Sequence, residues 1–257
     1  MKMFSTLSMR KTVRALCFAA AIVPLCGQTA NGTFEPPRLK DGHPNFQGLW
    51  KTAGGFGPPA PTGRSAGPLP KFEYLAAAEA KKQELLTSGR AEDLVAQCVT
   101  ASVPRATLEP PYPMMIVQDG KYVVILHEFA HDFRIIPTDG SPHPKNYSAL
   151  GGDSRGRWEG DTLVVDVTNF SKGIRWLHMG GDFIDENAHV IERYTLIDAD
   201  TIRYDVTIDD PTVLAKPWSG KLNLLRQPKD DQIIEGACRE GERDLEHYVQ
   251  SEAAKSK

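Results

Sequence analysis

Short runs of β-branched and aromatic residues, separated by turns rich in Asp and Gly, follow one another from Met114 almost to the C-terminus. This spacing predicts an antiparallel meander. We expect a mainly β fold, because about eight strands can close into a lipocalin-like barrel and so remove the exposed edges of an open sheet. The predicted strands are Met114–Gln118, Tyr122–Phe129, Phe133–Pro137, Thr162–Thr168, Val190–Ile197, Thr201–Ile208, Lys221–Leu225 and Gln232–Ala237.

One predicted hairpin, Val190–Ile197 with Thr201–Ile208, can pair in two registers. A loop of odd length places two mostly apolar faces opposite each other, whereas a two-residue loop turns His189 and Arg193 inward with fewer apolar companions. The first register is favoured. It buries Glu192, whose carboxylate is costly to desolvate without a partner. The facing residues are then Val190, Glu192, Tyr194 and Leu196 on one strand and Ile202, Tyr204, Val206 and Ile208 on the other.

The chain before these strands has a different composition. Asn31 to Pro70 is dense in Gly and Pro, which predicts an extended arm with a short first strand at Asn45–Trp50. Lys71 to Gln97 is rich in Ala, Glu, Lys and Leu and predicts a helix, interrupted near residues 88–89. Residues 31–97 are therefore expected to pack on a β-barrel-like domain of residues 98–257, which a short helix at Glu240–Gln250 completes.

The first 30 residues have the order of a secretory signal peptide. A cationic stretch ending at Arg14 precedes an apolar run, Ala15 to Leu25, and then small and polar residues. The run has about 11 residues, whereas a membrane-spanning helix needs roughly 20. Cys26 raises a lipoprotein alternative, which the large Leu25 before it disfavours. We expect a periplasmic or secreted protein, cleaved near residues 26–31, without a membrane span.

The remaining composition fits one compact domain. The net charge is -3, and the Lys and Arg residues are scattered singly along the chain. A protein that binds the phosphate backbone gathers these residues on one face, so nucleic acid is not an expected partner. The oligomeric state is left open.

Two cysteines, Cys98 and Cys238, remain once the signal peptide is removed. An oxidising compartment favours an intramolecular disulfide between them. In the chain-entropy model, closing so long a loop adds about 4–5 kcal/mol of stability. Two buried free thiols are the alternative.

The stretch from His127 to His131 matches the His-Glu-x-x-His signature of zinc peptidases. On a helix, the two histidines bind one zinc and the glutamate, here Glu128, acts on the bound water. The flanking residues are β-branched and end at Pro137, which favours strands, and a strand sends His127 and Glu128 to opposite faces. No third ligand follows at the expected spacing. Zinc bound by His127 and His131 therefore stays the alternative to a protein without a cofactor.

The motif Gly152-Asp153-Ser154-Arg155-Gly156-Arg157-Trp158-Glu159-Gly160-Asp161-Thr162-Leu163-Val164-Val165-Asp166 resembles one found in a family of exported, largely uncharacterised proteins of soil and acidobacterial genomes. Four further stretches agree, so the resemblance covers nearly everything after residue 90. They are Cys98 to Tyr112, Glu128-x-x-His131-x-x-Arg134 with Asp139-Gly140 and His143-Pro144, His189 to Arg193, and Asp209 to Trp218.

The resemblance implies a β-barrel-like body and no particular chemistry. Glu128 and His131 have counterparts in the family pattern, whereas the position of His127 is usually aromatic there. The resemblance therefore implies that the match of His127 to the zinc signature is incidental. Cys98 and Cys238 also match the pattern, in line with a disulfide. The glycine-rich beginning of the motif has no phosphate-loop Lys-Ser/Thr and is expected to be a turn.

Our leading functional hypothesis is a barrel that encloses a small organic molecule and performs acid–base chemistry on it as a lyase, isomerase or hydrolase. A His–carboxylate pair in an apolar cavity can hold pKa values near neutrality, as that chemistry requires. A ligand-binding protein without turnover, and a structural role in the envelope, are alternatives. The candidate catalytic residues are Glu128, His131 and Glu192, and the candidate substrate-binding residues are Arg134, Tyr194, Tyr204, His189, Arg193 and Trp158.

Overall fold

The computed structural model describes residues 34–53, 69–88, 92–109, 112–234 and 236. The expected signal peptide, Cys238 and the expected C-terminal helix lie outside these residues. Within the described parts of the chain, no helix is long and apolar enough to cross a membrane.

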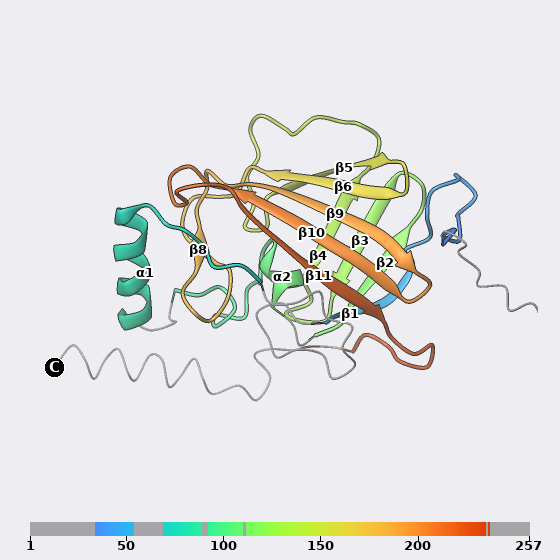
Figure 1. Cartoon of the computed structure of the whole chain (residues 1–257), viewed down its shortest axis with the longest axis horizontal. Helices are drawn as coiled ribbons and strands as arrows, with labels where there is room; N and C mark the ends of the chain where they lie inside the picture. The colour runs from blue at the N-terminus through green and yellow to red at the C-terminus, as the bar shows by residue number, and fades with distance from the viewer. Residues whose placement is uncertain (1–33, 54–68, 89–91, 110–111, 235, 237–257) are drawn as a thin grey trace, which may run out of the picture. The chain divides into compact units, whose positions relative to one another are not determined.

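The fold is mainly β, as predicted, and is dominated by one antiparallel sheet of nine strands that coils into a nearly closed barrel (Figure 1). The strand order is β4-β3-β2-β1-β11-β10-β9-β6-β5. The strands are β1 Gly48–Ala53, β2 Met114–Gln118, β3 Tyr122–His127, β4 Phe133–Pro137, β5 Asp153–Glu159, β6 Thr162–Thr168, β9 His189–Asp198, β10 Thr201–Asp209 and β11 Trp218–Arg226.

A short hairpin and a helix lie beside the barrel, outside the nine-stranded sheet. β7 (Arg175–Trp176) pairs with β8 (Phe183–Ile184) in a separate hairpin, near which α1 (Ala76–Ser88) packs (Figure 1). Asp182 joins them, because its carboxylate accepts hydrogen bonds from Lys82 Nζ at 2.5 Å and from the Tyr74 hydroxyl at 2.7 Å. The pKa of Asp182 falls to about 2, since these donors and His178 outweigh the cost of burial.

Most predicted strands are present, and three coincide with β2, β4 and β6 in both limits. The glycine-rich start of the family-like motif is an exception. It was expected to be a turn, but Asp153–Glu159 is β5. Gly156 makes the strand possible at that place, since a Cβ there would lie 2.9 Å from the side chains of Ile136 and Thr138. The predicted strand at Gln232–Ala237 is not formed in its described residues, since 232–234 are irregular and Gly236 forms only an isolated bridge, while residues 235 and 237 lie outside the described chain.

The hairpin of β9 and β10 has the predicted register. Tyr204 lies opposite Tyr194, and Val206 lies opposite Glu192. The loop itself was predicted to be odd in length but has two residues, because Asp198 pairs with Thr201, and a bulge at Thr201/Ile202 produces the predicted register. Glu192 therefore faces inward, whereas His189 and Arg193 face outward.

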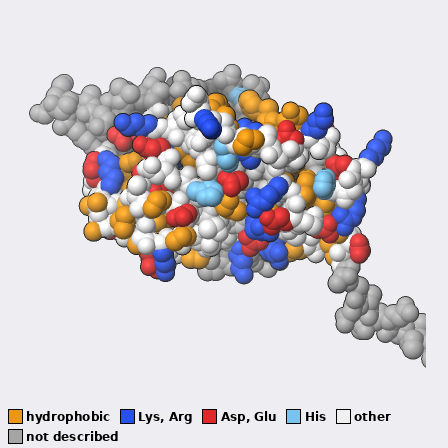
Figure 2. Space-filling model, turned by 90° about the horizontal axis from the view of Figure 1, so that it is seen from above, with side chains coloured by type: hydrophobic (Ala, Val, Ile, Leu, Met, Phe, Trp, Pro, Cys, Tyr) orange, Lys and Arg blue, Asp and Glu red, His pale blue; other side chains and the backbone are white. Residues whose placement is uncertain are grey.

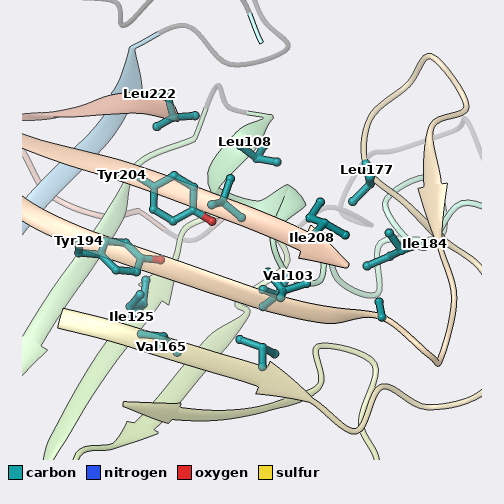
Figure 3. Close-up of a cluster of buried hydrophobic side chains, with 14 of the residues drawn as sticks. Val103, Leu108, Ile125, Val165, Leu177, Ile184, Tyr194, Tyr204, Ile208 and Leu222 are labelled. Atoms are coloured by element: carbon teal, nitrogen blue, oxygen red, sulfur yellow. The ribbon is translucent and has the colours of Figure 1, made fainter. Parts of the chain in front are cut away.

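The inward side chains pack into one apolar core. Figure 3 shows Ile125, Val165 and Leu222 from the barrel strands directed toward the same interior as Leu108, which belongs to α2 (Arg105–Leu108). Each of these four side chains is at most 1% exposed. The interior is thus lined mainly by apolar side chains, and any polar group within it must be satisfied by other side chains or by a bound molecule.

Candidate functional site

Glu192 is the centre of a polar group inside the barrel. Its side chain is fully buried. The carboxylate accepts hydrogen bonds from Arg134 Nη1 at 3.1 Å and Nη2 at 2.5 Å, from the Tyr194 hydroxyl at 3.0 Å and from the Tyr204 hydroxyl at 2.8 Å. The two phenol rings pack with their centroids 4.9 Å apart. Together with Ser154, these residues are called the Glu192 cluster below.

Strand alternation explains how the cluster assembles. Glu192 and Tyr194 are two apart on β9 and therefore share a face, and Tyr204 is the cross-strand partner of Tyr194. Figure 3 shows both tyrosine hydroxyls directed into the barrel. Arg134 comes from β4, at the far edge of the sheet, and completes the group.

Arg134 also spans the seam at which the barrel would close. β4 and β5 are the two edges of the sheet, and no ladder of backbone hydrogen bonds joins them in the described chain. Arg134 Nη2 donates to Ser154 Oγ on β5 at 2.9 Å while it holds Glu192 on β9. The hydrogen bond from Arg134 to Ser154 therefore links the two edges through their side chains, and the ion pair with Glu192 holds the guanidinium in place.

The electrostatics of the cluster fix the protonation states of Arg134, Tyr194 and Tyr204. Burial alone would lower the pKa of Arg134, but the attraction of Glu192 outweighs it and the pKa is raised. Burial, followed by the charge of Glu192, raises the pKa of Tyr194 and of Tyr204. The guanidinium is therefore charged and both phenols keep their protons at any ordinary pH.

His127 lies beside the cluster and is unsatisfied. It is the last residue of β3 and faces inward, and it is diagonal to Arg134, which pairs with Ile125. The side chain is buried, and Nε2 has no hydrogen-bond partner. Burial, then the charge of Arg134, lowers the pKa of His127 to about 3. The imidazole is consequently neutral near pH 7.

The other two predicted catalytic residues lie elsewhere. Glu128 follows β3, and its Oε2 accepts the backbone N–H of Ile234 at 3.0 Å. His131 is exposed on the turn after β3, where Ala130 and His131 both have positive φ angles. The structure therefore does not bring Glu128 or His131 into the Glu192 cluster.

The zinc-peptidase arrangement needs a helix at this motif, and the chain forms none here. Residues 122–127 are strand β3 and residues 128–132 form a turn, as the β-branched flanks predicted. His127 is buried and His131 is exposed, so the two rings do not share a helical face. Across the part of the chain that the structure covers, no group of three or more His, Cys, Asp and Glu is arranged to hold a metal ion.

Three of the predicted substrate-binding residues also lie away from Glu192. His189 Nε2 is 3.1 Å from Asp166 Oδ1, and Arg193 Nη2 donates to Glu159 Oε2 at 2.7 Å, both on the outer surface. Trp158 stacks on His43 at 4.6 Å between ring centroids. Arg134, Tyr194 and Tyr204 are thus the predicted binding residues that the fold gathers around Glu192.

The outer face of β5, β6 and β9 carries a polar group that the sequence analysis did not single out. His143 Nδ1 lies 2.6 Å from Asp153 Oδ2 and its Nε2 lies 3.0 Å from Asp166 Oδ1, so the ring bridges two carboxylates. Figure 2, a view from the side on which β5 and β6 lie, shows histidine, acidic and basic side chains intermixed. All three residues lie in stretches of the family-like pattern, but no spacing within that pattern predicted that they meet.

Ser154 and the unsatisfied nitrogen of His127 were also missed. Ser154 was hidden because its segment was expected to be a turn. His127 was considered only as a zinc ligand, although its place two residues after Ile125 on an alternating strand indicated an inward side chain. No protein-family model and no curated protein matches this chain.

Proposed function

We propose that this is an exported protein whose barrel binds a small polar molecule at the Glu192 cluster and His127, without turnover. The observation that carries the proposal is the buried Nε2 of His127, which lacks a partner beside a charged and hydrogen-bonded group. Buried polar atoms in native proteins are rarely left unsatisfied, so such an atom points to a bound water or ligand.

The pKa directions favour binding over acid–base catalysis. General acid–base groups work best when their pKa lies near the working pH. The pKa of His127 is about 3, and those of Tyr194 and Tyr204 are raised above their ordinary value. None of these three groups exchanges a proton near neutrality, so the lyase, isomerase or hydrolase hypothesis finds no support in them.

The unsatisfied groups indicate the chemistry of the ligand. Arg134 uses four of its five N–H groups on Glu192 and Ser154, and its second Nη1 N–H has no acceptor among the described residues. A hydroxyl or amide could accept from that N–H and also pair with His127 Nε2. The ligand should be uncharged, because the charges of Arg134 and Glu192 cancel and His127 is neutral.

The test is a thermal-shift screen of the purified chain against neutral hydroxylated and amide compounds, together with native mass spectrometry for retained molecules. A ligand at 100 times its Kd stabilises by about 2.7 kcal/mol, which is a shift of several degrees for a domain of this size. His127→Phe should abolish the shift because it removes the nitrogen that the ligand satisfies.

Trp176→Phe is the matched control, because Trp176 Nε1 is the other buried side-chain nitrogen without a partner in the described chain and it lies on β7, in the separate hairpin. This variant should keep the ligand-induced shift. Binding that survives His127→Phe, or a screen and mass spectrum that yield no ligand, would count against the proposal.

The proposed export also implies the disulfide between Cys98 and Cys238. Two contacts place their neighbours close together: Thr100 Oγ1 donates to Asp132, and Gly236 forms a bridge with Phe129 on the same turn. Alkylation of the unfolded, unreduced protein should leave both thiols unlabelled, and reduction should release two. Labelling without reduction would establish free thiols instead.

A further inference from the structure

The outer face of β2, β3 and β4 is apolar throughout. Cross-strand register aligns Val117 with Val124 and Ile135, and Met115 with Leu126 and Phe133. Phe133 is 62% exposed and Ile135 is 53% exposed. The outward residues of the three strands, called the apolar face below, are Met115, Val117, Tyr122, Val124, Leu126, Phe133, Ile135 and Pro137.

The opposite wall of the same barrel shows what a solvated outer face looks like in this protein. Most outward positions of β10 and β11 are occupied by polar or charged side chains, among them Arg203, Asp205, Thr207 and Lys221. A continuous apolar surface on three neighbouring strands is unusual for a surface left in water, and typically marks a place that another element covers.

We propose that the C-terminal segment, residues 238–257, covers the apolar face. The described chain ends beside it: Gly236 forms a bridge with Phe129, and Glu128 accepts the backbone N–H of Ile234 at 3.0 Å. Both contacts are on the turn that joins β3 to β4. The chain therefore leaves the barrel at the end of the face that Phe133 occupies.

The sequence of this segment fits that place. Leu245, Tyr248 and Val249 recur at helical spacing, whereas the residues between and before them are mostly charged. A helix at 240–250 would be about 16 Å long, close to the length of a five-residue strand, roughly 17 Å. Such a helix makes about three turns, and its apolar side would lie on the three strands while its charged residues stay in water.

The test compares the full chain with a version that stops after Arg239, which keeps Cys238. In the full chain we expect a monomer with little binding of a hydrophobic dye. The truncated chain should bind the dye, and backbone amides of β4 should exchange about tenfold faster or more. Leu245→Asp with Val249→Asp should reproduce these changes at full length, in case truncation prevents folding. Glu246→Ala, on the polar side, is the control and should change neither readout.

Two outcomes would overturn the proposal. If neither truncation nor the paired Asp variant changes dye binding or exchange in β4, the segment does not cover the apolar face. If the full chain is a dimer that Ile135→Asp dissociates and the paired Asp variant does not, a second copy of this chain covers it.

Discussion

His127 should make the folded protein sensitive to acid. Its pKa falls from an ordinary value of 6.5 to about 3 in the folded state, chiefly because the ring is buried and secondarily because of Arg134. The unfolded chain therefore binds more protons than the folded chain between these two values. Stability is retained above about pH 6.5 and is lost as the pH falls toward 3.

The size of this effect follows from linkage. About 2.5 pH units separate the ordinary pKa from pH 4, and each unit is worth about 1.4 kcal/mol, so the folded state should lose roughly 3 kcal/mol between pH 7 and pH 4 through His127 alone. Such a loss is a large part of the free energy of unfolding of a typical protein, which is roughly 5–15 kcal/mol.

The assay is urea unfolding at pH 7 and at pH 4 for the wild type and for His127→Phe. The substitution removes the titrating ring, so the variant should lose about 3 kcal/mol less stability over this range than the wild type, because the carboxylates contribute equally to both proteins. At pH 7 it should be neutral or stabilising, since an unsatisfied buried nitrogen is removed. Ile125→Val, on the same face of β3, is the control: it should cost about 1 kcal/mol at both pH values. Parallel pH profiles for the wild type and His127→Phe would refute the reasoning.

Three further predictions concern the barrel interior and its seam. Arg134→Met should lower the free energy of unfolding by about 3–5 kcal/mol, because it leaves the buried carboxylate of Glu192 without its cation, and adding Glu192→Leu should restore most of that loss. Urea unfolding of the two single variants and the double variant measures this, and a double variant as unstable as Arg134→Met would contradict it. Tyr204→Phe should cost roughly 1–3 kcal/mol by the same measurement, since Glu192 loses one donor, and an unchanged midpoint would show that this hydrogen bond contributes nothing. Gly156→Ala should lower the stability by about 1–3 kcal/mol, because it forces the edges of β4 and β5 apart, whereas Gly151→Ala, in open space, should leave thermal stability unchanged. Equal effects of the two substitutions would show that close packing of β4 on β5 at Gly156 does not matter for stability.

Periodicity in the sequence predicted most of the strands and one register, but not β5. Alternation in residues 201–208 placed Tyr204 on the buried face, and pairing it with residues 190–196 brought Glu192 and Tyr194 to the same side. This is local information, because the period of a strand and the length of its loop fix which side chains share a face. Half of the candidate site was therefore predictable from one hairpin.

Only the tertiary structure decided which distant residues reach Glu192. Arg134 lies on β4, at one edge of the sheet. Ser154 lies on β5, a segment whose glycines had predicted a turn. Barrel closure sets both contacts, and closure depends on the summed twist and stagger of nine strands, to which no short motif corresponds. The same closure separates Glu128 and His131 from Glu192, although sequence patterns alone had grouped the three residues.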